Sequence, residues 1–163
     1  PDPHGAEAEL TGTCMGARVC FFDTRFLANG NTYKIGETHQ FQMGALAHTL
    51  GPAQDTEAET EDGVKVSFKG AYAYMPARSG EEQTECADYW FHSPLEGETT
   101  RAALDSVTLT GFPITLALPN DFPMSLTLFA ADHVLAPDDL SMQNVKAETD
   151  LEGFLWLQGH LAE

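Results

Sequence analysis

The sequence predicts an all-β domain, and three observations support this prediction. Apolar and polar residues alternate with a period of two along most of the chain, which is the pattern of a strand with one buried face. About eight such runs are separated by turn residues, with no helical segments between them of the kind that builds parallel sheets. The length of 163 residues suits one domain. We therefore expect a single β domain over residues 1–163, folded as an antiparallel β-sandwich, with a small closed β-barrel as the alternative.

The strongest local signal is a hairpin centred on Asn29-Gly30. The flanking residues 18–27 and 32–43 are rich in β-branched and aromatic residues or alternate in polarity. An Asn-Gly pair between two such runs favours a type I′ turn, because both central residues of that turn need positive φ. Residues 43–50 have a second interpretation as one or two helical turns, since Ala and Leu are good helix formers.

The remaining elements follow from the same alternation. Gly70 is expected to mark a bulge or bend in its strand. The strand over residues 107–118 is expected to break at Gly111–Pro113, because proline cannot donate to a ladder hydrogen bond. A short helix is expected to begin at Pro137. The expected strands, in chain order, span residues 6–14, 18–27, 32–43, 64–75, 85–92, 107–118, 124–135 and 145–157.

The segment over residues 53–62 differs in composition from the rest of the chain. It carries several carboxylates and no large apolar residue. Such a charge run is expected to stay hydrated, so we predict an acidic solvated loop. Its spacing does not match the pattern of a calcium-binding loop.

The charge balance excludes two classes of partner. The chain carries 25 Asp and Glu against 8 Lys and Arg, for a formal net charge of −17. A surface of this sign repels the phosphates of nucleic acids and of anionic lipids, which are bound by clustered Lys and Arg. No apolar stretch approaches the roughly 20 residues that a membrane-spanning helix needs. We therefore expect neither nucleic-acid binding nor membrane insertion.

Three cysteines are candidates for a disulfide: Cys14, Cys20 and Cys86. Because the number is odd, one bond leaves one thiol free or available for an intermolecular bond. The expected bond either involves Cys86 or joins Cys14 to Cys20. Reduced core cysteines, or a soft metal site that also uses Met15 and His92, are the alternatives.

Cysteine usage also bears on localisation. Disulfides persist in oxidising compartments, so we expect an exported protein, either periplasmic or extracellular. The chain begins at Pro1, which is compatible with a cleaved signal peptide. A cytoplasmic protein that has lost its initiator Met is the alternative.

Glu37 and His39 are candidate metal ligands. They lie two residues apart, so in a regular strand they share a face with Tyr33 and Phe41. A carboxylate and an imidazole on one face are able to bind a metal or to act as an acid/base pair. The other interpretation is a polar rim at the end of a strand. We expect no cofactor, with a transition metal or calcium as the alternative.

The aromatic residues Trp90, Phe154 and Trp156 are the candidate interaction surface. Phe154 and Trp156 alternate with leucines in the last expected strand and fall on the side that also carries Lys146 and Glu148. If that strand is regular, two large rings face solvent or a partner. The alternative is a bulge at Gly153 that returns both rings to the core.

These observations favour a function in binding over a function in catalysis. The chain lacks a G-x-S-x-G nucleophile elbow and glycine-rich phosphate loops, and we assign no catalytic residue. The expected function is a non-catalytic, acidic binding or assembly module, exported or part of a larger extracellular or virion-type assembly. Its partner is expected to be another protein or a second copy of the chain. A β-barrel that binds a small ligand and a periplasmic metal-binding protein are the alternatives.

Overall fold

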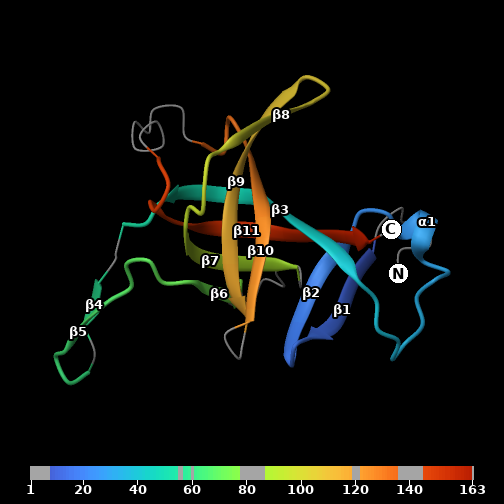
Figure 1. The fold of residues 1–163 in the computed structure, drawn as a ribbon, viewed down its shortest axis with the longest axis horizontal. Helices are drawn as coiled ribbons and strands as arrows, with labels where there is room; N and C mark the ends of the chain where they lie inside the picture. Colours follow the sequence, from blue (N-terminus) through green and yellow to red (C-terminus); the bar gives the residue numbers. More distant parts are fainter. Residues whose placement is uncertain are drawn as a thin grey trace.

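The computed structural model describes residues 8–54, 57–59, 61–77, 87–118, 122–135 and 145–162. These residues are mostly β, with one short helix, α1 (Phe26–Asn29) (Figure 1). The N-terminal half contains β1 (Ala8–Cys14), β2 (Ala17–Asp23), β3 (Phe41–Pro52), β4 (Glu57–Glu59), β5 (Lys65–Ser67) and β6 (Ala73–Pro76). The C-terminal half contains β7 (Asp88–Pro94), β8 (Thr100–Leu104), β9 (Val107–Leu118), β10 (Phe122–Ala131) and β11 (Asp150–Leu161).

Nine of these strands form one sheet around β11. Its main path runs β1-β2-β11-β3-β10-β9-β8, and β6 and β7 join it beside β11. Strand β11 is long enough that one of its edges pairs with β7 over its first part and with β2 near its end. Its other edge pairs with β3. Strands β4 and β5 form a separate two-stranded sheet, which projects away from the main sheet (Figure 1).

The all-β prediction is confirmed, but the expected pairing is wrong in two places. Strand β11 runs parallel to β2, and β10 runs parallel to β3, so the sheet is mixed rather than antiparallel. The sheet formed by the described strands is also open, so the closed barrel is not formed. Two hydrogen bonds nevertheless link β9 to the end of β7. Thr115 N donates to Ser93 Oγ (3.1 Å), and Glu96 N donates to Pro113 O (3.0 Å).

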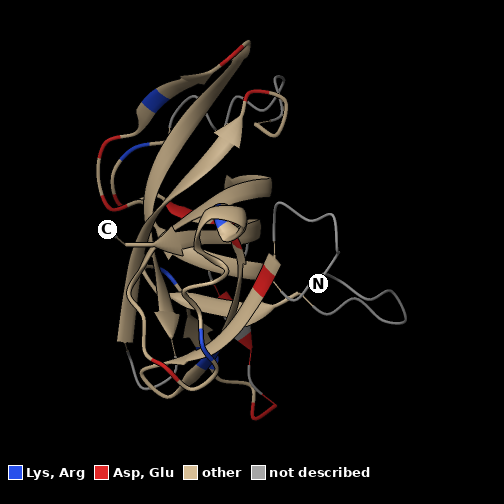
Figure 2. Cartoon of the chain, turned by 90° about the vertical axis from the view of Figure 1, so that its right-hand side faces the viewer, with Lys and Arg blue, Asp and Glu red and all other residues tan. Residues whose placement is uncertain are grey.

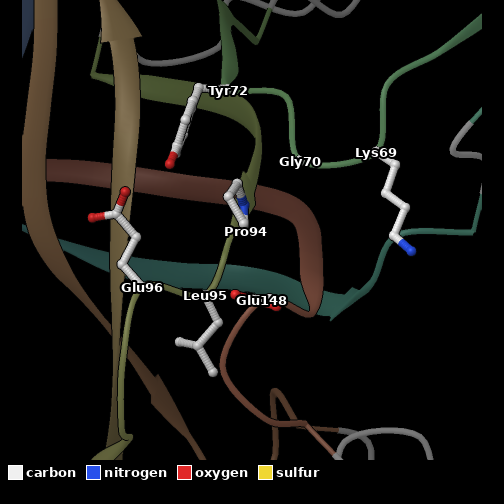
Figure 3. Close-up of a pocket in the computed structure, with 7 residues that line it drawn as sticks. All are labelled: Lys69, Gly70, Tyr72, Pro94, Leu95, Glu96 and Glu148. Atoms are coloured by element: carbon white, nitrogen blue, oxygen red, sulfur yellow. The ribbon is translucent and has the colours of Figure 1, made fainter.

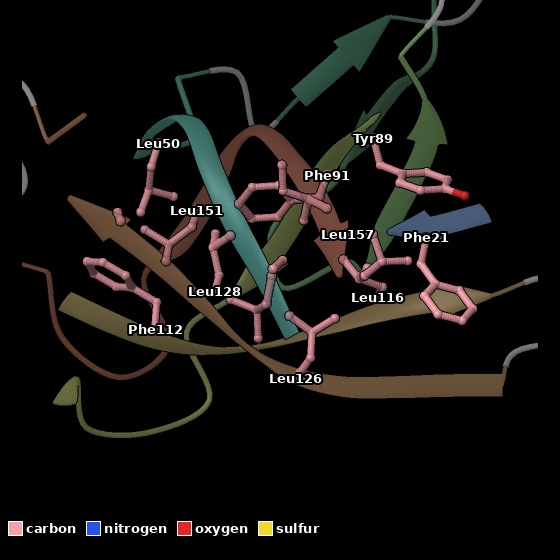
Figure 4. Packing of buried hydrophobic residues seen from close by; sticks show 14 of the residues in the cluster. Phe21, Leu50, Tyr89, Phe91, Phe112, Leu116, Leu126, Leu128, Leu151 and Leu157 are labelled. Atoms are coloured by element: carbon pink, nitrogen blue, oxygen red, sulfur yellow. The ribbon is translucent and has the colours of Figure 1, made fainter. Parts of the chain in front are cut away.

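The core packs against one face of the sheet, where buried side chains of several strands meet (Figure 4). It consists of alternate residues from β2, β3, β7, β9, β10 and β11. Each completely buried leucine contributes about 2 kcal/mol from removal of its surface from water. The largest buried apolar side chains are Phe91, Leu95, Ile114, Leu116, Leu118, Leu128, Leu151, Leu155 and Leu157.

The predicted hairpin at Asn29-Gly30 is wrong. Residues 26–29 form α1, and Gly30 has a φ of −55°, which a type I′ turn does not allow. The N-terminal hairpin joins β1 to β2 instead, through Met15 and Gly16 with φ of 49° and 87°. A methionine in this conformation gives no compositional signal, because positive φ is rare outside Gly, Asn and Asp. The helical interpretation of residues 43–50 is also wrong, because these residues lie in β3.

Strand β9 is continuous, so the predicted break at Gly111–Pro113 is wrong. Pro113 pairs with Thr127 of β10, and its carbonyl accepts the hydrogen bond from Glu96 N. Gly111 allows β8 to approach, since a Cβ there would lie 2.7 Å from Thr100 Oγ1. The strands expected over residues 107–118 and 124–135 correspond to β9 and β10, which pair antiparallel, and β8 was not predicted.

Gly70 divides the expected strand over residues 64–75 into two strands of different sheets. Its φ of 72° turns the chain between β5 and β6. Within the acidic segment over residues 53–62, Glu57–Glu59 pairs with β5, so part of the predicted loop is a strand. The side chains of Glu57 and Glu59 are exposed, as expected of a hydrated segment. The helix predicted from Pro137 lies outside the described residues.

Candidate functional site

Three side chains of adjacent strands form a row on the face of the sheet that is turned away from the core. Trp90 of β7 lies opposite Phe154 of β11 and opposite Met75 of β6. Directly opposite residues in antiparallel strands place their side chains on the same face. Phe154 is 44% exposed and Met75 is 56% exposed, and Trp90 between them is half-buried.

A second row continues this surface. Trp156 lies opposite Asp88 of β7 and Leu46 of β3, and its ring centroid is 4.6 Å from that of Phe22. Phe129 of β10 is the register partner of Leu46. We call the two rows together the aromatic face, and its seven large apolar members are all at least partly exposed: Phe22, Leu46, Met75, Trp90, Phe129, Phe154 and Trp156.

The alternation of β11 explains why these rings lie outside the core. Leu155 and Leu157 are buried, so Phe154 and Trp156 point to the opposite face. The register shifts between Phe154 and Leu155, where β3 contributes the extra residue His48. Phe154 stays exposed beside this bulge. The alternative, in which a bulge at Gly153 returns both rings to the core, is therefore not observed.

One polar pair lies beside the rings. His48 Nε2 is 3.0 Å from Asp88 Oδ1, and His48 itself is exposed. The Nε1 atom of Trp156 is enclosed and has no hydrogen-bond partner among the described residues. The His48–Asp88 pair therefore places ionisable groups beside the rings, and Glu9, the register partner of Phe22, is a further carboxylate on this face.

Sequence reasoning identified Trp90, Phe154 and Trp156, and the structure brings these three residues together. It missed Phe22 and Phe129, whose place depends on parallel pairing. It also missed His48, which lies two residues after Leu46 in β3 and is exposed. Pairing between strands that are distant in the chain leaves no local pattern in the sequence.

The candidate metal ligands lie elsewhere, in the segment between α1 and β3. His39 Nε2 is 3.9 Å from Glu37 Oε2. Among the described residues, no three His, Cys, Asp or Glu side chains are grouped around one point. Two ligands leave most of the coordination sphere of zinc or calcium unfilled.

The same segment is anchored by a buried carboxylate. Asp23 is completely buried and accepts hydrogen bonds from Tyr33 Oη (2.6 Å) and from Arg25 N (2.8 Å). Burial raises the pKa of Tyr33 to about 12, with contributions from the hydrogen bond to Asp23 and from its charge. The Tyr33 ring also packs edge-on against His39, with ring centroids 5.6 Å apart. This arrangement holds the segment in place and requires no ligand.

The described cysteines differ in their environments. Cys14 is exposed and free, so a bond between Cys14 and Cys20 is not formed. Cys20 is buried, and its Sγ accepts a 3.6 Å hydrogen bond from Thr11 Oγ1. Cys86 lies outside the described residues, so a bond involving Cys86 stays a prediction.

Acidic residues dominate the charge of the surface. Asp and Glu recur in loops and at strand ends, whereas Lys and Arg occupy only a few short segments (Figure 2). No helix in the described part of the chain is both long and apolar enough to cross a bilayer. Comparisons of the chain with protein-family models, with curated proteins and with solved structures give no match.

Proposed function

We propose that the protein is a non-catalytic binding module that docks on a partner protein through the aromatic face. The observation that carries this proposal is the row formed by Met75, Trp90 and Phe154 across three adjacent strands. Aromatic residues and Met are enriched in the centres of protein interfaces, and contiguous exposed apolar surface is uncommon on monomers. The Trp90 and Trp156 rings supply large contact areas at a small cost in side-chain entropy.

The charge of the chain favours a basic partner. Each copy carries a net charge of −17, so two copies repel one another at low ionic strength. A partner with apolar side chains surrounded by Lys and Arg gains both from burial and from electrostatic attraction. An exported location is part of this proposal, and its support is the cysteine content of the chain.

A selection from random peptides tests this proposal. Dodecapeptides of random sequence, displayed on phage, are selected on the immobilised protein. We expect the enriched peptides to combine Lys or Arg with Leu, Phe or Trp, and to bind more weakly as salt is added. Selection of acidic or purely polar peptides would contradict the proposal.

Two matched variants then locate the binding surface. Phe154→Ala removes a ring of the aromatic face that is 44% exposed, and Phe68→Ala removes a ring elsewhere that is 42% exposed. We expect Phe154→Ala to weaken the selected peptide at least about tenfold, the loss typical of an interface anchor, and Phe68→Ala to leave affinity unchanged. Equal affinities for all three proteins would place binding elsewhere.

Self-association is the other outcome to be measured. We expect sedimentation velocity to show a monomer at low salt, because of the charge repulsion between copies. A stable dimer at low salt that Phe154→Ala dissociates would replace the basic partner by a second copy of the chain.

A further inference from the structure

A groove with a mixed polar and apolar lining lies between the loop before β6 and strands β9 and β10. It consists of two adjoining open pockets of about 520 and 420 Å³, and Tyr72 and Glu96 line both. The hydroxyl of Tyr72 and the carboxylate of Glu96 point toward one another across the groove, above Pro94 and Leu95 (Figure 3). The volume of each pocket is in the range of small-molecule sites.

The groove contains a connected row of hydrogen-bonding groups. Tyr72 donates to the Glu96 carboxylate, and this bond, with smaller effects of burial and of the Glu96 charge, raises the pKa of Tyr72. Thr115 Oγ1 donates to Glu96 Oε2 (2.9 Å) and lies 2.9 Å from Ser125 Oγ. Because Thr115 donates its one proton to Glu96, Ser125 donates to Thr115. The row therefore presents a carboxylate and hydroxyl oxygens that keep free acceptor sites.

Buried polar groups hold the Tyr72 loop in position. The single N–H of Gly70 donates to both carboxylate oxygens of Asp150, at 3.0 and 3.1 Å. His92 Nδ1 lies 2.9 Å from the carbonyl oxygen of Ala71. Both contacts are made to the two residues that immediately precede Tyr72. These contacts therefore fix the backbone immediately before Tyr72.

The other wall of the groove is held in a similar way. Ser93 is completely buried, and its Oγ accepts from Thr115 N (3.1 Å) and donates to Pro94 O (2.9 Å). The described residues contain five buried polar side chains, and four of them, His92, Ser93, Thr115 and Asp150, adjoin this groove. Burial of a polar group is costly unless the group is hydrogen-bonded. The hydrogen bonds of these four side chains hold the walls of the groove in fixed positions.

We infer that this groove binds a neutral carbohydrate. The ring of Tyr72 is 43% exposed and offers a flat apolar surface to the C–H face of a sugar ring. The Glu96 carboxylate and the Ser125 hydroxyl oxygen offer adjacent acceptors for the hydroxyl groups of a sugar. The lining carries two carboxylates, Glu96 and Glu148, against one ammonium group, Lys69, so its charge disfavours anionic ligands, as does the net charge of −17. The rigid walls reduce the entropy lost on binding.

A glycan microarray that carries neutral, sialylated and sulfated oligosaccharides tests this inference. We expect binding to a subset of the neutral glycans and none to the acidic ones. Absence of binding, or binding confined to acidic glycans, would overturn the inference. Calorimetric titration with Ca²⁺ and with spermidine is run in parallel. Saturable binding of either cation that is lost in Glu96→Gln would also overturn it, in favour of a cation site.

Variants assign the signal to the groove. Tyr72→Ala is expected to weaken the best neutral glycan at least about tenfold, as measured by calorimetry. Tyr72→Phe keeps the ring and is expected to lose less, which separates stacking from a defect in folding. Phe68→Ala, with 42% exposure of its ring, is the matched control and should bind as the unchanged protein does. Full affinity in Tyr72→Ala would overturn the inference.

One variant distinguishes glycan binding at the groove from binding at the aromatic face. Phe154→Ala is expected to leave glycan affinity unchanged, because Phe154 does not line the groove. Loss of glycan binding in Phe154→Ala with a preserved fold would place the glycan on the aromatic face and overturn the groove assignment.

Discussion

Phe154 lies directly opposite Trp90 in the β7–β11 pair, while the next residue along β11, Leu155, is completely buried. Two adjacent residues of β11 thus differ in environment: Leu155 packs in the core, and Phe154 lies at the surface. A large exposed ring contributes little to stability. The row that Phe154 forms with Trp90 and Met75 is the basis of the proposed docking face.

Neighbouring alanine substitutions on β11 should lower stability by very different amounts. Leu155→Ala is expected to lower the free energy of unfolding by about 2–5 kcal/mol, because it leaves a cavity in the core. Phe154→Ala is expected to cost less than about 1 kcal/mol, because its ring is partly hydrated in the folded state. Urea unfolding of both variants measures the difference. Comparable losses for the two would show that Phe154 belongs to the core.

Gly153 is expected to resist substitution because the backbones of β3 and β11 approach closely there. A Cβ at Gly153 would lie 2.1 Å from Thr49 O, whereas a Cβ at Gly12 of β1 would meet nothing within 4 Å. Gly153→Ala should therefore lower stability by about 2 kcal/mol or more. Gly12→Ala should be neutral or slightly stabilising, since glycine in a strand costs entropy. Equal thermal stabilities of the two variants would contradict this register.

The hydrogen bond from Tyr33 to Asp23 predicts a loss of stability in alkali. In the folded protein the pKa of Tyr33 is raised from 10.0 to about 12. Between these values the unfolded chain releases the Tyr33 proton and the folded chain keeps it, so the free energy of unfolding falls as pH rises. Below the lower value the stabilisation is fully present. At neutral pH Tyr33→Phe should be less stable, because the buried Asp23 loses a donor.

Comparison with Tyr33→Phe isolates this effect from the other tyrosines. The stability difference between the two proteins should shrink as pH rises from 10.0 toward 12. Ultraviolet titration should lose its highest-pH tyrosine transition in the variant. A constant stability difference across this range would show that Tyr33 ionises equally in both states.

The cysteines should yield one reactive thiol. With Cys14 free, the pair left for a bond is Cys20 and Cys86. Alkylation of the denatured, unreduced protein from its natural source should therefore give one adduct, located at Cys14 by peptide mapping. Reduction before alkylation should give three adducts. Three adducts without reduction would show that the chain is fully reduced, and would argue against export.

Local patterns in the sequence predicted much of the fold and part of the candidate site. The β9–β10 hairpin and the exposed side of β11 follow from alternation alone, because residues that alternate in a strand fall on opposite faces. The hairpin expected at Asn29-Gly30 failed because Phe26, Tyr33 and Asp23 hold that segment against the end of β2. The turn that does join two strands contains Met15, whose positive φ no composition rule anticipates.

The sequence did not predict the groove, because residues that are distant in the chain support it. Its support comes from contacts such as Asp150 to Gly70, which lie 80 residues apart in the chain. In the sequence, Asp150 is one more acidic residue in a very acidic chain. Only the tertiary structure shows that this carboxylate is buried and paired with a backbone N–H group.

The two tryptophans of the chain, Trp90 and Trp156, both belong to the aromatic face. Their indole N–H signals in a ¹⁵N-labelled sample therefore report on this surface directly. On titration with the tightest peptide from the phage selection, we predict that both indole signals shift or broaden, and that Phe154→Ala abolishes the response. Saturable peptide binding that leaves both indole signals unchanged would contradict the assignment of the aromatic face as the docking surface.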